Sequence, residues 1–454
     1  DFPYAVAAVA LLAAVAPSAP TYLTLLSSLG VLVLVALLTL ELTGSRRATL
    51  LASAFVAASA PFWAASAGLL ETGGTTTVFL LGGLVALCRS RRVSPRPSAP
   101  ILRIVAGASF GMAVGFHHAS AILVAGAVLS FSWARFGGSL RHGLVVAASS
   151  ATALLPLAAY NTWLFGSPFA TGYGAGADFL DDTVQGSSGG LVNLRVGLLG
   201  TQLWRYLGRP EILLLVVAAV LGWLYLRRSS PESFVRPLGL SLLLGGVPYL
   251  VFTGARPLWG SGNDYQANAS FLRYSLPLIA VTSALAAGWV IAALSRRRWV
   301  AGVLAAVVLV GAFATTTRSP TNPVSYRRSV ALDDQRQEQL LEIVPPDALV
   351  VTFKNDKLLW PQRSTLTAAY LAERQSAEIT HVYDATPGPE RLADVLLRLV
   401  ELGEDVWLYD DSAWLGANPD MFPAFDLLLL EQGVQRLPTG VEALYRIQPP
   451  PSAG

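Results

Sequence analysis

Charge is scarce in this sequence. Charged residues make up only 13% of its 454 residues, about half the share found in soluble globular proteins. Hydrophobic residues make up 53%, and the mean hydropathy is +0.51. This composition excludes an ordinary cytosolic enzyme, a disordered chain and a nucleic-acid-binding protein. The single cysteine, Cys88, excludes an intramolecular disulfide and a cysteine-based metal cage.

Lysine is nearly absent as well, and the remaining charges are unevenly distributed. The only lysines are Lys354 and Lys357. Residues 1–318 hold 21 basic and 9 acidic residues, whereas residues 319–454 hold 11 and 20. The chain starts with Asp1 rather than Met, and no basic segment precedes the first apolar run. We therefore expect no signal peptide here and a true start that lies upstream.

The first half contains long apolar runs. A membrane-spanning helix needs about 20 mostly apolar residues, because the hydrocarbon core is about 30 Å thick. Backbone groups in hydrocarbon must be paired within their own segment, so each run is predicted to be a helix. The charge-free runs are 22–40, 48–70, 73–88, 143–160, 212–226, 237–255, 274–295 and 299–317.

The stretch 104–134 is predicted to form a hairpin rather than one crossing. Both of its ends are basic, and a single crossing would put Arg103 and Arg135 on opposite sides of the membrane. Two short helices that meet near His117 keep both arginines on one side. Residues 3–16 are few for a crossing, so we expect an outer interfacial or partly inserted helix there. The sequence thus predicts an all-α polytopic membrane bundle of about ten transmembrane segments.

Arginine sets the expected orientation of this bundle. Most basic residues of the first half fall in five short segments, and the positive-inside rule places these segments in the cytoplasm. The outer side then holds the turns at Glu71 and at His117–His118, the loops 161–211 and 256–273, and everything after Thr317. We predict a multi-pass protein of the plasma (inner) membrane with an extracytoplasmic C-terminal domain. The five basic segments are 46–47, 89–103, 135–141, 227–236 and 296–298.

From Ser319 the composition becomes that of a soluble protein, after a Pro-containing linker at 319–323. Helix-like and strand-like patterns alternate here, which is typical of an α/β layer. We predict two domains, a multi-span membrane domain at 1–318 and a small α/β soluble domain at 319–454. The expected strands are 348–353, 405–409 and 441–445, and the expected helices are 327–343, 389–402 and 423–432.

Acidic side chains are almost absent from the predicted spans. All nine acidic residues of the first half are expected at span ends or in loops. Ionisable groups inside the bilayer mark ion and proton paths, so their scarcity argues against a proton-coupled carrier and a charged pore. This pattern favours polar chemistry at the outer face, where long loops meet the helix ends.

Three segments of the first half carry a family resemblance. The first is Asp1-Phe2-Pro3-Tyr4. The second is the span that breaks at Ser59-Ala60-Pro61-Phe62 and ends at Leu69-Leu70-Glu71-Thr72. The third consists of Tyr160-Asn161, Phe165-Gly166-Ser167-Pro168 and Thr171-Gly172-Tyr173, with Phe271-Leu272-Arg273-Tyr274-Ser275-Leu276-Pro277 further on. By their order, spacing and predicted sidedness, residues 1–318 resemble the membrane glycosyltransferases of the GT-C superfamily, of the protein O-mannosyltransferase and aminoarabinose-transferase type.

The resemblance implies an enzyme that takes a sugar from a polyprenyl-phosphate carrier and transfers it, with inversion, at the non-cytoplasmic face. The implied partners are the polyprenyl-phosphate-linked sugar, membrane lipids, and a lipid, glycan or protein acceptor. The cofactor is unknown, with a divalent cation as one option. In this family an Asp early in the first outer loop acts as catalytic base or metal anchor. That position would precede residue 1, so Asp1 is not given this role.

Two outer carboxylates are the candidate catalytic groups. Glu71 ends a span before Gly73-Gly74, and the resemblance places an acidic residue there. Asp264 is the acidic residue of the loop 256–273. A carboxylate at either place can orient or deprotonate an acceptor hydroxyl or amine, or help to hold a divalent cation. The alternative for Glu71 is a solvated helix end.

Outer arginines and histidines are the candidate substrate-binding groups. The planar guanidinium of Arg suits phosphate because it donates two parallel hydrogen bonds. Arg205 and Arg273 are outer arginines, and Arg273 belongs to the family-like motif; a salt bridge or a headgroup contact is the alternative. His117 and His118 are expected at the hairpin tip, where one can reach a lipid phosphate and the other can be interfacial. The candidates for sugar binding are Tyr160, Asn161 and Tyr173.

Two other functions stay open on the sequence alone. A transporter or flippase of lipid-linked saccharides would show broken helices or inward charges near the midplane, and neither is clear. A non-catalytic membrane scaffold would use its outer domain to bind a cell-wall partner. A natural gene that also began at Asp1 would favour the scaffold.

Overall fold

The computed structural model describes two compact units, a helical unit within residues 1–326 and a sheet unit that contains most of the C-terminal part. The predicted boundary at 318–319 stays a prediction, because residues 319–334 lie outside the described part. The described residues are 19–66, 72–92, 98–133, 139–165, 168, 200, 210–229, 234–255, 264–294, 298–318, 335–352, 359, 362–367, 396, 398–409, 435–441 and 443–448.

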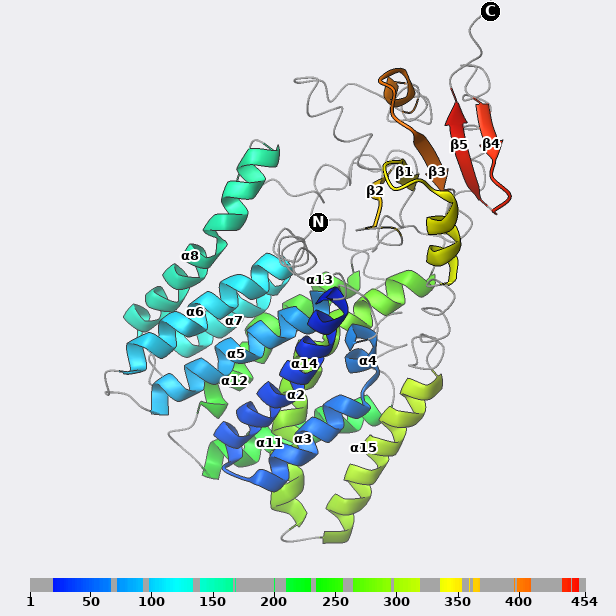
Figure 1. The fold of residues 1–454 in the computed structure, drawn as a ribbon. Coiled ribbons are helices and arrows are strands. Elements are labelled where there is room, and N and C mark those ends of the chain that lie inside the picture. The colour runs from blue at the N-terminus through cyan, green and yellow to red at the C-terminus, as the bar shows by residue number, and fades with distance from the viewer. Residues whose placement is uncertain are drawn as a thin grey trace, which may run out of the picture. The chain divides into compact units, whose positions relative to one another are not determined.

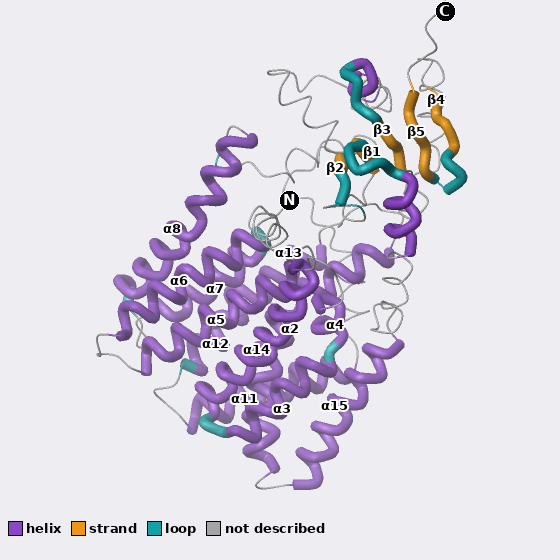
Figure 2. Tube along the Cα trace, viewed as in Figure 1, coloured by secondary structure: helices purple, strands orange, loops and turns teal. Residues whose placement is uncertain are grey.

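The helical unit is a bundle whose helices connect through short turns or through segments outside the described residues (Figures 1 and 2). A π-helical turn, η3, joins two of the helices. The elements are α2 Ala19–Thr43, α3 Arg46–Ala58, α4 Ala60–Ser66, α5 Thr72–Arg92, α6 Ser98–Phe116, α7 Ser120–Ser132, α8 Leu140–Phe165, α11 Pro210–Ser229, α12 Val235–Ser241, η3 Leu242–Gly246, α13 Val247–Ala255, α14 Asp264–Leu294 and α15 Arg298–Arg318.

The described helices confirm a multi-pass membrane bundle. Seven spans within them are long and apolar enough to cross a membrane, or eight if the bent pair α3–α4 is one span. Two further apolar helical segments, Ser120–Ser132 and Gly302–Ala314, are shorter. Each predicted segment therefore has a helical counterpart. Residues 3–16, where an interfacial helix was expected, lie outside the described residues.

The predicted hairpin forms with unequal arms. Helices α6 and α7 meet in a tight turn, in which the Ser120 amide donates to the His117 carbonyl at 2.9 Å. The sequence predicts two short arms, but α6 has 19 residues and is long enough to cross by itself. The difference arises because α6 extends past Arg103 to Ser98, since a single arginine near a helix end is tolerated at the membrane interface.

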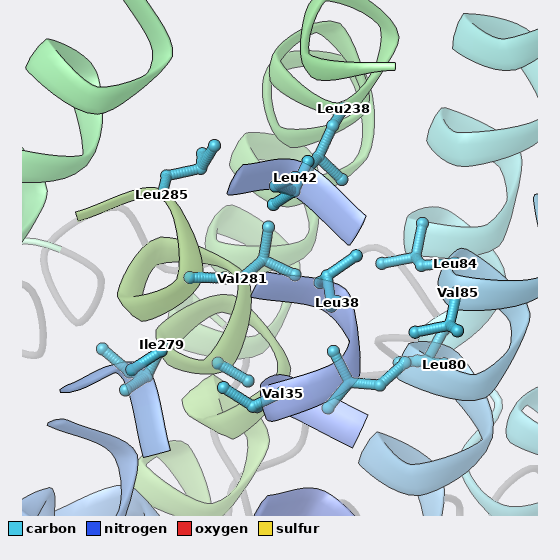
Figure 3. Close-up of a cluster of buried hydrophobic side chains, with 14 of the residues drawn as sticks. Val35, Leu38, Leu42, Leu80, Leu84, Val85, Leu238, Ile279, Val281 and Leu285 are labelled. Carbon is cyan, nitrogen blue, oxygen red and sulfur yellow. The ribbon is translucent and has the colours of Figure 1, made fainter. Parts of the chain in front are cut away.

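The core of the helical unit lies around α2. Val35 and Leu38 are fully buried. Figure 3 shows α2 side chains between those of α5, such as Leu80, and those of α14, such as Val281. Small residues allow close approach elsewhere, because a side chain at Gly83 of α5 would collide with the ring of Phe110.

The helix α3 is followed by α4 at an angle of 68°, at the predicted break. Ser59 leaves the helical conformation, and its amide and hydroxyl both donate to the Val56 carbonyl, at 3.0 and 2.7 Å. The Thr316 hydroxyl donates to the Ala58 carbonyl at 2.8 Å. Two carbonyls near the break are therefore satisfied by hydroxyl groups of the protein itself.

The sheet unit is a five-stranded mixed sheet with strand order β2-β1-β3-β5-β4. The first three strands are parallel, and the last two pair as an antiparallel hairpin beside β3. Its small core gathers Leu340, Val350, Trp407 and Leu444. The strands are β1 Leu349–Thr352, β2 Ser364–Thr367, β3 Val406–Tyr409, β4 Gln435–Pro438 and β5 Leu444–Gln448.

The sheet confirms the α/β expectation and corrects one strand. β1 and β3 form where they were expected, and residues 335–343 and 398–401 are helical as expected. The strand expected at 441–445 instead begins at Leu444, because the preceding residues form the hairpin turn. Gly440 and Ala443 have φ of 85° and 64° in that turn, which ends a strand. The helix expected at 423–432 lies outside the described residues.

Candidate functional site

The helical unit has one end rich in hydroxyl and aromatic groups, here called the polar end. It comprises the starts of α2, α5 and α14 and the ends of α4 and α6. Two pairs of hydroxyls join helices here: the hydroxyl oxygens of Ser27 and Thr75 lie 2.9 Å apart, and the Ser28 hydroxyl donates to that of Ser66 at 2.8 Å. Pairing removes much of the cost of placing polar groups in an apolar surrounding. Three helices are thereby held in a fixed relation at this end.

Arg273 lies against the first turn of α5. A Cβ at Gly73 would stand 3.3 Å from the Arg273 carbonyl oxygen and 3.4 Å from its Cβ. Only a glycine allows α14 to come so close to α5 without displacement. Glu71 lies outside the described residues, but it stands two positions before Gly73 in the chain. Packing thus brings Arg273 to the helix start that follows Glu71.

His117, Tyr249 and Tyr274 form a ring cluster beside Arg273. The His117 ring stacks on the Tyr274 ring, with centroids 4.3 Å apart and planes 27° apart. Tyr249 of α13 meets the His117 ring edge-on, at 6.3 Å. The Arg273 guanidinium stands 5.9 Å from the Tyr274 ring centroid, within cation–π range. The cluster therefore ties α6, α13 and α14 together next to a positive charge.

The two histidines of the turn differ in their surroundings. The side chain of His117 is buried, with 8% of the residue exposed. His118 is half-buried, and burial lowers the pKa of its imidazole below the ordinary 6.5. His118 is therefore neutral at physiological pH, where it can offer one N–H donor and one acceptor but no charge.

The other predicted residues are not shown to join this cluster. Asn161 of α8 is buried, and the neighbouring Tyr160 is 38% exposed and lies beside Trp163, with ring centroids 6.2 Å apart. Asp264 is the first residue of α14, nine positions before Arg273, which corresponds to about 13 Å along a helix. Glu71, Tyr173 and Arg205 lie outside the described residues.

Tyr249 and Tyr274 were missed as candidates on the sequence. Tyr249 lies within the predicted span 237–255, where it is the one residue with a phenol hydroxyl, and it is 1% exposed. A tyrosine away from the membrane interface was the signal that could have identified it, since Tyr is usually enriched at span ends. Tyr274 follows Arg273 in the family-like motif, and its adjacency to the arginine was the signal there.

No metal centre is evident within the described residues, where no three His, Cys, Asp or Glu side chains gather in a group that could hold an ion. Both candidate carboxylates fall where no side chain is described. The expectation of a divalent cation therefore stays a prediction that depends on Glu71 and Asp264.

Comparison with known proteins gives fold-level similarity alone. No family model matches the sequence, and no curated protein sequence matches it. Among solved structures, ArnT from Cupriavidus metallidurans bound to undecaprenyl phosphate is similar, with a TM-score of 0.52 and 13% identity over 94% of this chain and 83% of that chain. The apo state of ArnT gives a TM-score of 0.55 and 12% identity, covering 94% and 82%.

A second kind of protein is similar over nearly the whole chain. The oligosaccharyltransferase AglB from Archaeoglobus fulgidus, in complex with an inhibitory peptide and a dolichol-phosphate, has a TM-score of 0.52 and 13% identity. The match covers 98% of this chain and 66% of that one. ArnT and AglB are both GT-C glycosyltransferases. The helical bundle followed by a small mixed sheet therefore has the GT-C glycosyltransferase fold.

Proposed function

We propose that this protein is a membrane glycosyltransferase that takes a sugar from a polyprenyl-phosphate carrier and transfers it to an acceptor at the outer face. The observation that carries the proposal is the shared fold with two proteins whose structures hold undecaprenyl phosphate and dolichol-phosphate. A fold hosts many functions, so the argument needs a site as well. We place that site at the polar end of the bundle, and the packing of Arg273 against the start of α5 supports this choice.

Arg273 is the proposed partner of the carrier phosphate. Its guanidinium can give two parallel hydrogen bonds to a phosphate, at a helix end that a lipid chain reaches from the bilayer. His117 and Tyr274 act as positioning residues, because their stacked rings fix the start of α14 against α6. His118 is a neutral hydrogen-bonding group for the substrate at the same turn.

The carboxylate of Glu71 is the preferred base for the acceptor, with Asp264 as the second choice. The acceptor hydroxyl or amine gives its proton to the carboxylate while its oxygen or nitrogen attacks the anomeric carbon. The bond from that carbon to the phosphate oxygen breaks, and its electron pair leaves with the polyprenyl phosphate. Attack from the face opposite the phosphate gives inversion. Glu71 is preferred because Gly73, two residues on, contacts Arg273.

The remaining predicted residues would form the sugar and acceptor side of the site. Tyr160 and Asn161 lie together near the end of α8, and Tyr173 and Arg205 belong to the connection between α8 and α11. If Asp264 is the base, Glu71 would instead be available to hold a divalent cation that neutralises the leaving phosphate. The sheet unit would stand on the outer side of the plasma membrane, near a lipid, glycan or protein acceptor.

Transfer from a lipid-linked sugar by the purified full-length protein tests the proposal. Arg273→Ala should lower transfer about 10–100-fold, because hydrogen bonds to a charged group contribute about 1.5–3 kcal/mol each. Arg46→Ala is the matched control, since Arg46 is an exposed arginine at the start of α3. Undiminished transfer by the Arg273 variant would remove the arginine from the site, and no transfer by the wild-type protein from any polyprenyl-linked sugar would reject the enzyme.

The break between α3 and α4 bears on the transporter alternative. Broken helices in transporters expose backbone carbonyls that bind ions or substrates. Here the Val56 and Ala58 carbonyls already accept hydrogen bonds from Ser59 and Thr316. Proteoliposomes separate the two functions: a flippase would translocate lipid-linked sugar without acceptor, whereas the transferase would release polyprenyl phosphate only when acceptor is present.

A further inference from the structure

The end of the bundle opposite the polar end carries an excess of positive charge. Between Thr72 and Ala177 the sequence has no Asp or Glu, but it has seven arginines and three histidines. Within the described part of this end, Glu41 forms ion pairs at 3.0 Å with Arg89 and Arg92. Arg92 also donates to the Glu41 backbone carbonyl at 2.9 Å. The one nearby carboxylate is thus already engaged by two arginines.

Packing brings the other cations together from three helices. A Cβ at Gly107 of α6 would collide with the Val146 carbonyl of α8, and the Ser150 hydroxyl donates to the Gly107 carbonyl at 2.9 Å. Arg103 precedes Gly107 by one turn on α6, and His142 precedes Val146 by one turn on α8, so Arg103 and His142 lie next to each other. Figure 1 shows α6 beside α8, and α5 packs against α6.

The third helix adds Arg91 to the same place. Gly83 of α5 meets Phe110 of α6, and the two helices run in opposite directions. Arg91 comes eight residues after Gly83 on α5, and Arg103 comes seven residues before Phe110 on α6. Because the two helices are antiparallel, the two arginines lie at about the same height along the bundle. Arg141 directly precedes His142 on α8, so the contacts of α6 with α5 and with α8 bring four basic residues close to one level of the bundle.

Arg91 is held in place and still has donors to offer. One guanidinium nitrogen donates to the Phe131 carbonyl at 3.1 Å, and the guanidinium lies 5.2 Å from the centroid of the Phe131 ring. A guanidinium has five N–H donors, so further bonds are available. Within the described residues, no carboxylate pairs with Arg91, Arg103 or Arg141. Like charges gathered in this way favour a bound anion.

The surface around these cations is apolar and exposed. Ile101 of α6 is 63% exposed and Leu140 of α8 is 73% exposed, and Ile104 and Leu144, one turn or less away, are also exposed. Trp133, just after α7, is half exposed, as is typical of an interfacial aromatic side chain. A soluble phosphate ion would not need this surface, whereas the acyl chains of a lipid would cover it.

We propose that Arg91, Arg103, Arg141 and His142 form a binding site for the phosphate headgroup of an anionic bilayer phospholipid, whose acyl chains lie along α6 and α8. The site is separate from the proposed transfer site. Arg103 and His117 stand 14 residues apart on and just beyond α6, about 21 Å along the helix. The inference therefore holds or fails independently of the glycosyltransferase activity.

Native mass spectrometry of the purified full-length protein with added lipids tests the site. The wild-type protein should retain phosphatidylglycerol in preference to phosphatidylcholine. Arg103→Gln with Arg141→Gln should lower phosphatidylglycerol affinity about 30-fold, at about tenfold or less per arginine near a membrane surface. The matched control is Arg46→Gln with Arg47→Gln, because these two arginines are exposed at the start of α3. This control should change the affinity for phosphatidylglycerol less than about threefold.

Three results would overturn the site. The first is equal affinity of the two double variants for phosphatidylglycerol. The second is no preference of the wild-type protein for phosphatidylglycerol over phosphatidylcholine. The third is equal thermal stabilisation by millimolar inorganic phosphate and by phosphatidylglycerol, which would indicate a free anion instead. Arg141→Gln alone guards against misfolding, because Arg141 is exposed and has no described hydrogen bond. This single variant should keep the wild-type elution profile and bind phosphatidylglycerol about fivefold more weakly.

Discussion

The ring of His117 stacks on the ring of Tyr274, with centroids 4.3 Å apart, although 157 positions separate the two residues in the chain. The contact joins the turn after α6 to the start of α14, next to Arg273. The imidazole is buried, so it packs within the protein. It does so next to Arg273, the residue that we propose to bind the carrier phosphate. This relationship leads to the first prediction.

His117→Phe should keep the stack, and His117→Ala should lose it. An aromatic pair contributes about 0.5–1.5 kcal/mol beyond its buried area, so the Ala variant should unfold at lower temperature. We expect His117→Phe to retain transfer within about threefold, and His117→Ala to lose about tenfold through a higher KM for the lipid-linked donor. If Phe is as damaging as Ala to transfer while preserving stability, the imidazole itself contacts substrate and the positioning role is wrong.

The close approach of α5 and α14 gives a second prediction. Gly73→Ala places a methyl group 3.3 Å from the Arg273 carbonyl oxygen, a tight contact that a few tenths of an ångström of movement would relieve. Because the move shifts Arg273, transfer should fall about tenfold with little loss of stability. Gly82→Ala is the control, because its nearest neighbours are 4.0 Å away and alanine favours a helix by up to about 1 kcal/mol over glycine. Equal transfer by the two variants would contradict a role for this contact.

The positions of the helices could be predicted because each depends on a local property of the chain. Charge-free runs fix the spans, and the basic residues at both ends of 104–134 require the turn at His117. The bend before α4 could also be predicted, since Ser59 and Pro61 favour a helix end followed by a helix start.

The contacts of the site could not be predicted, because they join segments distant in sequence. Arg273 and Gly73 are 200 positions apart, and their contact depends on how α5 and α14 pack. Tyr249 reaches His117 from a third helix for the same reason. In the sheet unit, β2 and β4 have only four residues each and no apolar alternation, so neither carried a strand pattern.

The ion pairs of Glu41 give a prediction about stability. Its side chain is 9% exposed, whereas those of Arg89 and Arg92 are 45% and 57% exposed. Water screens the arginines, so Glu41→Gln should cost about 1–2 kcal/mol, less than the loss of one partner of a fully buried pair. Thermal unfolding in detergent measures the loss, with Arg46→Gln as a control that should change nothing. An unchanged midpoint of thermal unfolding for Glu41→Gln would mean that the ion pairs between α2 and α5 do not stabilise the fold.

The half-buried His118 gives a pH dependence. Burial lowers the pKa of this imidazole in the folded protein, so folding favours its neutral form. The stability that results is present above the unfolded pKa of about 6.5 and is lost as the pH falls below it. The unfolding temperature of the wild-type protein should therefore decrease more between pH 7.5 and 5 than that of His118→Gln. Parallel curves for the two proteins would show that His118 does not titrate abnormally.

The orientation of the bundle is the last prediction, and it determines on which side the transfer occurs. The ends of α5 and α11 carry Arg89, Arg91, Arg92, Arg227 and Arg228, and basic residues near span ends stay in the cytoplasm. Alkaline phosphatase fused after Gly454 should therefore be active, since that enzyme needs the outer compartment. The same reporter fused after Arg92 should be inactive. The reversed pattern would place the polar end with Arg273 in the cytoplasm, where a donor presented at the outer face could not reach it.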